Sequence, residues 1–149
     1  MNKRQKTILI DFITIILITA IAVTAMIDFK NWVNRSEVMR AIQQLGGIVA
    51  EYRKEHGSIP PESYVNNIKE GLEGHVRLGT LHYRARWIDF ECPPDEILAY
   101  VEREYHSLFL GHGFVVLRMD GSVAWMNKQE FETLFARQRK PAEVQPYQR

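Results

Sequence analysis

The sequence has little cysteine and lacks the common motifs of redox, nucleotide-binding and metal-binding sites. Its single cysteine, Cys92, excludes a disulfide within the chain. No CxxC, Walker-type or GxGxxG motif is present, and the five histidines show neither HExxH nor paired Cys/His spacing. These absences predict a protein that is not an enzyme, that needs no cofactor, and that has no small-molecule substrate.

A surplus of charge is also missing. The chain of 149 residues has 19 Lys and Arg against 18 Asp and Glu, so its formal net charge is +1. A nucleic-acid-binding domain needs a basic face, and this balance argues against nucleic acid as a partner. Three Trp, six Tyr and seven Phe indicate instead a packed domain.

Proline is absent from residues 1–58, and charge is almost absent from residues 8–27. Twenty helical residues cover about 30 Å, the thickness of the hydrocarbon core of a bilayer. We therefore predict a transmembrane helix over 8–27, preceded by a basic arm over 1–7. Lys3, Arg4 and Lys6 place this arm in the cytoplasm by the positive-inside rule, and the domain over 28–140 outside it.

A cleaved secretory signal peptide is the alternative interpretation of this N-terminus. Small residues at Ala20, Ala22 and Ala25 would supply a cleavage site. The apolar run is longer than the usual apolar region of a signal, and the helical pattern continues beyond it without a break. Both features favour an anchor that is retained.

Asp11 is the one acid in the predicted span. A charge at the centre of a bilayer costs about 2.5–3.5 kcal/mol on insertion scales, and less near the cytoplasmic end where Asp11 lies. Its carboxylate either reaches the interface or pairs with a positive group on a neighbouring subunit, which makes Asp11 a candidate residue for helix assembly.

An amphipathic helix follows the span. Apolar residues recur at steps of four and three, which is the pattern of one buried helix face: Val38, Ile42, Leu45, Val49 and Tyr52. A new helix capped by Ser36 is one alternative, and the absence of proline favours the other, a single rod. Gly46-Gly47 indicates close packing of another element or a bend. Gly57, followed by Pro60-Pro61, should end the helix.

The remaining segments predict a small α+β domain. We expect a short helix from Pro61 and a strand over 81–87 with Arg84 and Arg86 on its solvated face. The apolar run over 97–101 is a second strand candidate, although propensity alone also allows a helix there. A loop should follow over 105–113. The tail over 141–149 is polar and is expected to be flexible.

A hairpin is the clearest local signal in this domain. Asp120-Gly121 separates two β-prone runs and predicts a type I′ turn. Asn127 with Glu130 then forms the capping box of a last helix, whose apolar face is Phe131, Leu134 and Phe135. The predicted fold class is therefore α+β: a long N-terminal helix on a small antiparallel sheet, with a short C-terminal helix.

This order of elements resembles the type IV pilin-like proteins, in particular the pseudopilins of type II secretion. The stretch from Tyr52 through Gly57 to Pro60 is similar to the family's tyrosine–glycine–proline sequence at the end of the helix. The DGSVAWM stretch over 120–126 resembles the family's C-terminal hairpin. The resemblance implies a single-pass structural subunit of the inner membrane, with the lipid bilayer and other pilin-like subunits as partners.

The chain departs from the family at the prepilin peptidase site. Leu9-Ile10-Asp11 matches Leu-Ile-Glu, which makes Thr7 the first residue after cleavage and puts Lys6 where the family has glycine. This degenerate site favours a first rival interpretation, a membrane-tethered domain of the same fold that no longer assembles.

A second rival is a tethered enzyme or metal-binding domain. It would use His106 and His112 with nearby acids: Asp89, Glu91, Asp95 and Glu96. Cys92 is a conceivable nucleophile, but the spacing supplies no basic partner, and a packed thiol is the simpler interpretation.

Overall fold

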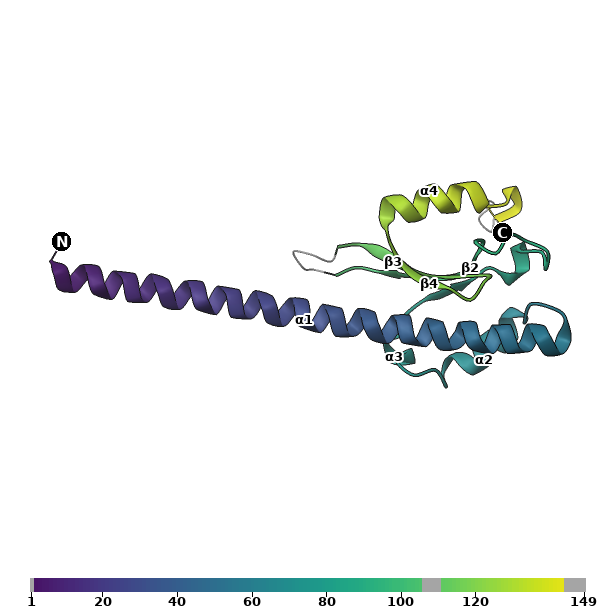
Figure 1. Cartoon of the computed structure of the whole chain (residues 1–149), viewed down its shortest axis with the longest axis horizontal. Coiled ribbons are helices and arrows are strands. Elements are labelled where there is room, and N and C mark those ends of the chain that lie inside the picture. The colour runs from purple at the N-terminus through teal and green to yellow at the C-terminus, as the bar shows by residue number, and fades with distance from the viewer. Residues whose placement is uncertain (1, 106–110, 144–149) are drawn as a thin grey trace, which may run out of the picture.

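The computed structural model describes residues 2–105 and 111–143. One helix, α1 (Lys3–His56), runs for 54 residues and dominates the shape of the molecule. Its N-terminal half projects alone, whereas its C-terminal half packs against a sheet (Figure 1). The prediction of one continuous rod is confirmed, and no second helix begins at Ser36.

The ends of α1 follow from local chemistry. Asn2 and Gln5 form a capping box at the start. Gly57 adopts a left-handed conformation with φ 64°, and its N–H donates to the carbonyl of Arg53 at 3.0 Å. Because glycine has no Cβ, it takes this conformation at low cost, and the helix ends as predicted.

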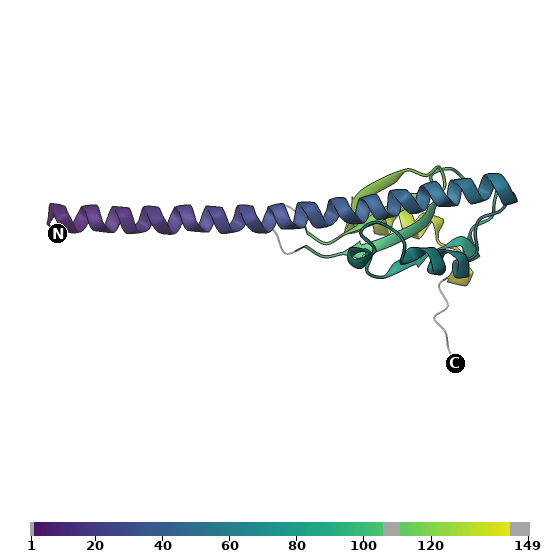
Figure 2. The ribbon, with the colours of Figure 1, turned by 90° about the horizontal axis from the view of Figure 1, so that it is seen from below.

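Two short helices connect α1 to the sheet. These are α2 (Glu62–Lys69) and α3 (His75–Leu78), which lie alongside the domain half of α1 (Figure 2). Val65 and Leu78 are their fully buried residues and join the core beneath α1.

The sheet has four antiparallel strands in the order β1-β2-β3-β4. They are β1 (Leu81–Tyr83), β2 (Ile97–Arg103), β3 (Gly113–Arg118) and β4 (Val123–Asn127). The central strand β3 is covered on both faces, and its residues alternate between two cores. Val115 and Leu117 pack toward α1, whereas Phe114 and Val116 pack toward the opposite face.

Helix α4 (Lys128–Gln138) covers that opposite face, so the domain has three layers (Figure 1). Asn127 and Glu130 form the predicted capping box, with the Glu130 N–H donating to Asn127 Oδ1 at 2.9 Å. Phe131 stacks on Phe114 with ring centroids 3.9 Å apart. The predicted apolar face of this helix is confirmed.

The β3–β4 hairpin is confirmed, but its predicted turn type is wrong. Type I′ needs positive φ at both central residues, and Asp120 has negative φ whereas Gly121 has φ 84°. The Gly121 N–H donates to the Arg118 carbonyl at 3.0 Å, and the Arg118 N–H to the Ser122 carbonyl at 3.0 Å. This pattern fits a three-residue loop in which Gly121 takes the left-handed position. Asp120 Oδ1 also accepts from the Ser122 N–H at 2.8 Å.

The predicted strand over 81–87 is wrong in its second half. β1 ends at Tyr83, and Ala85–Trp87 form a 3₁₀ turn, η1. The expectation that Arg84 is solvated is also wrong, because it is only 2% exposed, whereas Arg86 is exposed as predicted. The first residues of the tail predicted to be flexible, Pro141–Glu143, form a second 3₁₀ turn, η2.

Candidate membrane-anchoring and assembly surface

The N-terminal half of α1 presents apolar side chains that no other described segment of the chain covers. Its most apolar window of 18 residues has a mean hydropathy of 2.5 and is 0% buried. Large side chains on every side of the helix are exposed, from 45% at Ile27 to 76% at Met26. Exposure of apolar surface to water is unfavourable by about 25 cal/mol per Å², so this surface is a candidate for burial in a membrane or against other helices.

The polar groups in this half are satisfied within the helix. The hydroxyls of Thr14, Thr19 and Thr24 each donate to the carbonyl four residues earlier, at 2.8 to 2.9 Å. These bonds let a threonine sit in a hydrocarbon environment without an unpaired hydroxyl donor. The helix is thus chemically suited to a bilayer at every position of the span except one.

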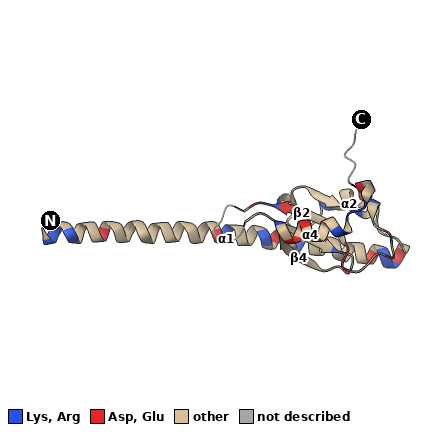
Figure 3. Ribbon diagram, turned by 90° about the horizontal axis from the view of Figure 1, so that it is seen from above, with Lys and Arg blue, Asp and Glu red and all other residues tan. Residues whose placement is uncertain are grey.

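That exception is Asp11, which forms no ion pair within the described part of the chain. Steps of three and four residues place Arg4, Thr7, Asp11 and Thr14 on one stripe of the helix. Figure 3 shows one isolated acidic position close to the basic N-terminus of α1, and the sequence identifies it as Asp11. A carboxylate at this position is available to a group outside the chain.

An aromatic pair follows the span. The rings of Phe29 and Trp32 stack with centroids 6.2 Å apart, and Trp32 is 60% exposed. Aromatic side chains are enriched at the level of lipid headgroups, because their apolar bodies and polar edges suit that layer. Their position fits a bilayer boundary just beyond Ile27.

The predicted turn residues Asp120 and Gly121 lie elsewhere, where the hairpin meets α1. The carbonyl oxygen of Gly121 is 3.5 Å from the point that a Cβ on Gly46 would occupy. Arg53 Nη1 donates to the Met119 carbonyl at 3.0 Å and fastens the same turn to α1. The prediction of close packing at Gly46-Gly47 is confirmed for Gly46, whereas a Cβ on Gly47 would meet open space.

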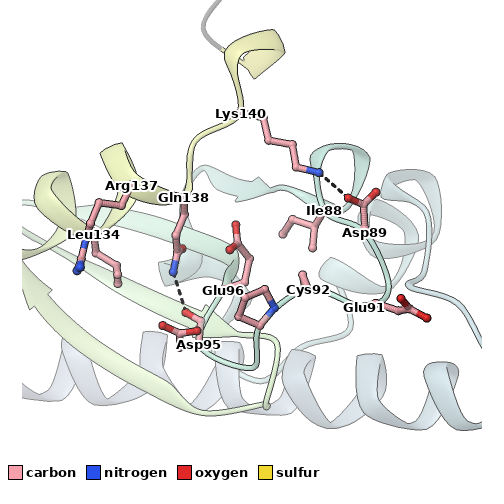
Figure 4. Close-up of a pocket in the computed structure, with 11 residues that line it drawn as sticks. Ile88, Asp89, Glu91, Cys92, Asp95, Glu96, Leu134, Arg137, Gln138 and Lys140 are labelled. Atoms are coloured by element: carbon pink, nitrogen blue, oxygen red, sulfur yellow. Dashed lines mark hydrogen bonds and ion pairs between the residues drawn. The ribbon is translucent and has the colours of Figure 1, made fainter.

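A cleft lies between the loop over 88–96 and the end of α4 and has a volume of about 720 Å³ (Figure 4). It collects the four acids singled out above, but their carboxylates are spread along the loop. Lys140 Nζ lies 2.7 Å from Asp89 Oδ2, and Glu96 Oε1 lies 3.3 Å from Arg84 Nη1. Among the described residues, no three His, Cys, Asp or Glu side chains are grouped so that they could hold a metal ion.

Cys92 lines this cleft and is half-buried. Burial, and then the negative charge of Glu96, raise the pKa of its thiol. A nucleophilic cysteine needs the opposite shift, because the thiolate is the reactive form. The geometry therefore fits the packed thiol expected from the sequence.

The histidine pair proposed for a metal site is only partly visible. His106 lies outside the described residues. His112 Nε2 lies 2.6 Å from Glu102 Oε1, at the ends of β3 and β2 that face the N-terminal half of α1. The acids of the loop over 88–96 belong to a different cleft, whose lining does not include His112.

Arg84 is a structural centre that the sequence did not reveal. Its Nε and Nη2 donate to the two carboxylate oxygens of Glu143 at 2.8 and 3.0 Å, and Nη1 donates to the Ile97 carbonyl at 2.6 Å. Burial alone would lower the pKa of Arg84, but the bonds to Glu143, and then the charges of Glu143 and Glu96, outweigh it and raise the pKa. Arg84 thus joins the end of β1, the start of β2 and the C-terminal segment.

Comparison with family models, curated proteins and solved structures gives no match to this chain. The fold and the surfaces described above are therefore the basis of any functional conclusion.

Proposed function

We propose that this protein is a single-pass membrane protein in which α1 both anchors the α+β domain and makes contacts with neighbouring membrane helices. The observation that carries the proposal is the contrast along one unbroken helix. Its first half is exposed and apolar, and its second half supplies the core face of the domain. No turn separates the two, so the span holds the domain at a defined distance from the bilayer.

The direction of insertion follows from charge. Basic residues before the span favour a cytoplasmic N-terminus, and the inner membrane with an extracytoplasmic domain is the arrangement that this orientation supports. The type II secretion pseudopilins resemble this arrangement in their long helix and small sheet. A pilin-like structural role is therefore part of the proposal.

Asp11 supplies a mechanism for helix contacts. Arg4 precedes it by seven residues on the same stripe, and seven residues of helix rise about 10.5 Å. Two parallel copies offset by this distance would bring Arg4 of one copy beside Asp11 of the next. Such a pair would not need the free terminal amine that prepilin cleavage releases, so Lys6 at the degenerate site is compatible with it.

The alternative is an anchor that does not assemble. Lys6 favours it, because a lysine replaces the glycine that the family's peptidase recognises. In that case the same helix contacts lipid alone.

Mass spectrometry of the N-terminus of the membrane-extracted protein tests the anchor. An intact terminus, or one at Thr7, supports a retained span, and the second would also show prepilin processing. A terminus near Met26 would mean a cleaved signal peptide and would overturn the proposal.

Cysteine cross-linking tests assembly. In a Cys92→Ser background, a chain with both Thr7→Cys and Thr14→Cys has two cysteines seven residues apart on the Asp11 stripe. The offset places position 7 of one copy beside position 14 of the next, so disulfides should form between copies in the membrane. The matched control is Leu9→Cys with Ile16→Cys, which have the same spacing on the opposite side of the helix. Asp11→Asn should abolish the cross-link. Equal cross-linking from both pairs, or none from the pair of Thr7→Cys and Thr14→Cys, would support the anchor that does not assemble.

A further inference from the structure

A second cleft lies where α1 leaves the predicted span. It has a volume of about 470 Å³ and is formed by α1, α3 and the end of β2. Its lining includes Ile27, the last residue of the apolar run, and Lys30 on the next turn of α1. The domain therefore reaches back along α1 to the point where a bilayer would begin.

Three cations from three different elements line this cleft. They are Lys30 of α1, Arg77 of α3 and Arg103 of β2. Glu104 is the acid among the lining residues and is exposed. The cleft is thus more basic than the chain as a whole, whose formal net charge is +1.

The three cations differ in how they are held. Arg77 Nε lies 2.5 Å from Glu37 Oε2, and Nη1 donates to Asn34, so its charge is already paired. Lys30 and Arg103 have no ion-pair partner among the described residues. The Arg103 guanidinium lies beside Gly79, 3.6 Å from where a Cβ would stand, and its Nε is buried without a hydrogen-bond partner there. Lys30 and Arg103 are available to an external anion.

An apolar side chain stands beside these cations. Val76 of α3 lines the same cleft as Ile27 and is 84% exposed. An exposed valine next to unpaired cations is what a surface needs in order to contact both the acyl boundary and the charged layer of a membrane.

The level of the cleft matches the headgroup layer. This layer is about 5–7 Å thick on each side of the hydrocarbon core. Lys30 lies three residues beyond Ile27, and three residues of helix rise about 4.5 Å. A phosphate in that layer would therefore lie at the height of Lys30 and of the cleft opening.

We infer that this cleft binds the phosphate of an anionic phospholipid of the bilayer in which the protein is anchored. Lys30 and Arg103 contact the phosphate, Arg77 shapes the wall between them, and Val76 enters the acyl boundary. The contact fixes the end of the domain nearest the membrane and restricts its rotation about α1. This inference rests on the proposed membrane anchor.

The test uses the full chain in lipid nanodiscs, with a fluorophore attached at Val76→Cys in the Cys92→Ser background. Lipids that carry a nitroxide at the headgroup quench a fluorophore only at short range. We expect strong quenching in discs that contain phosphatidylglycerol. In discs of phosphatidylcholine alone, or at high salt, quenching should fall at least twofold, because the contact is electrostatic.

Two further variants locate the effect. Lys30→Gln with Arg103→Gln should reduce the quenching at least twofold, whereas Arg40→Gln with Arg137→Gln removes the same charge outside the cleft and should not. A fluorophore at Lys54→Cys, near the far end of α1, should stay unquenched. Circular dichroism confirms that each variant is folded.

The possible outcomes distinguish failure of the phosphate site from failure of the proposed membrane anchor. A protein that does not enter nanodiscs contradicts the proposed anchor. A protein that enters them with the Val76 fluorophore unquenched overturns the phosphate site alone. Quenching that depends neither on lipid charge nor on the Lys30 and Arg103 substitutions would also overturn the phosphate site.

Discussion

The two halves of α1 share one backbone and differ in what surrounds them. In the N-terminal half no large side chain of the span is buried, whereas in the other half Val38, Ile42 and Leu45 have no exposed surface. The N-terminal half is apolar all round, and the C-terminal half is apolar along one stripe. The described part of the chain therefore covers only the striped half of α1 and leaves the surface of the other half open.

Removing the N-terminal half should have the largest effect. A chain that starts at Asp28 keeps every residue of both buried cores, so its domain should remain folded. At high salt, which screens the contact of Lys30 and Arg103 with lipid, its membrane association should be lost completely, because the removed half provides the apolar surface that lipid would cover. Flotation on a sucrose gradient and urea unfolding measure the two properties. A truncated chain that still floats with membranes under these conditions would contradict the assignment of anchoring to the N-terminal half of α1.

The two charged residues in unusual places, Asp11 and Arg84, should respond differently. Arg84→Met leaves the largely buried carboxylates of Glu96 and Glu143 without their cation and should destabilise the domain by about 3–5 kcal/mol. Asp11→Asn should change the stability of the domain by less than about 0.5 kcal/mol. Urea unfolding followed by tryptophan fluorescence measures both.

A paired variant checks the reason for the Arg84 effect. Adding Glu143→Gln to Arg84→Met removes the unpaired carboxylate and should recover part of the loss. If the double variant is as unstable as the sum of the two single variants, the two residues do not act as a pair.

The same truncation in each half of α1 gives a direct comparison. Ile42→Ala removes a side chain with 0% exposure and should cost about 2–5 kcal/mol through lost burial and a cavity. Ile16→Ala, at a position that is 52% exposed, should leave the urea midpoint of the domain unchanged. A large loss of domain stability in Ile16→Ala would show that the N-terminal half of α1 packs on the domain.

The adjacent glycines should give the smallest effects, with opposite signs. A Cβ on Gly46 would lie 2.8 Å from Leu117 Cδ1, so Gly46→Ala should destabilise the domain by about 1–2 kcal/mol. A Cβ on Gly47 meets open space, and Gly47→Ala should stabilise the helix by up to about 1 kcal/mol. Thermal unfolding of the two variants is the measurement, and two shifts of the same sign would contradict the close approach at Gly46.

Much of the fold could be predicted because its signals are local. The steps of three and four from Val38 identified the buried face of α1, and Gly57 identified its end. The Asn127 and Glu130 spacing identified the cap of α4. Each of these features depends on residues within one or two helical turns of each other, so the local sequence is sufficient to predict it.

The strand over 81–87 shows where such reasoning stops. Alternation favoured a strand with Arg84 on its solvated face, but β1 ends at Tyr83 and Arg84 turns inward. Its carboxylate partner Glu143 lies 59 residues away in the sequence. Nothing in the local pattern indicates a contact at that separation.

The sequence by itself determined the apolar half of α1, the buried face of its other half, the hairpin and the cap of α4, because hydrophobic periodicity and capping act over a few residues. Only the tertiary structure decided the burial of Arg84, the turn geometry at Asp120 and the cleft that joins Lys30, Arg77 and Arg103. Each of these depends on segments far apart in the chain, and their relative positions are set by the packing of α1 on the sheet.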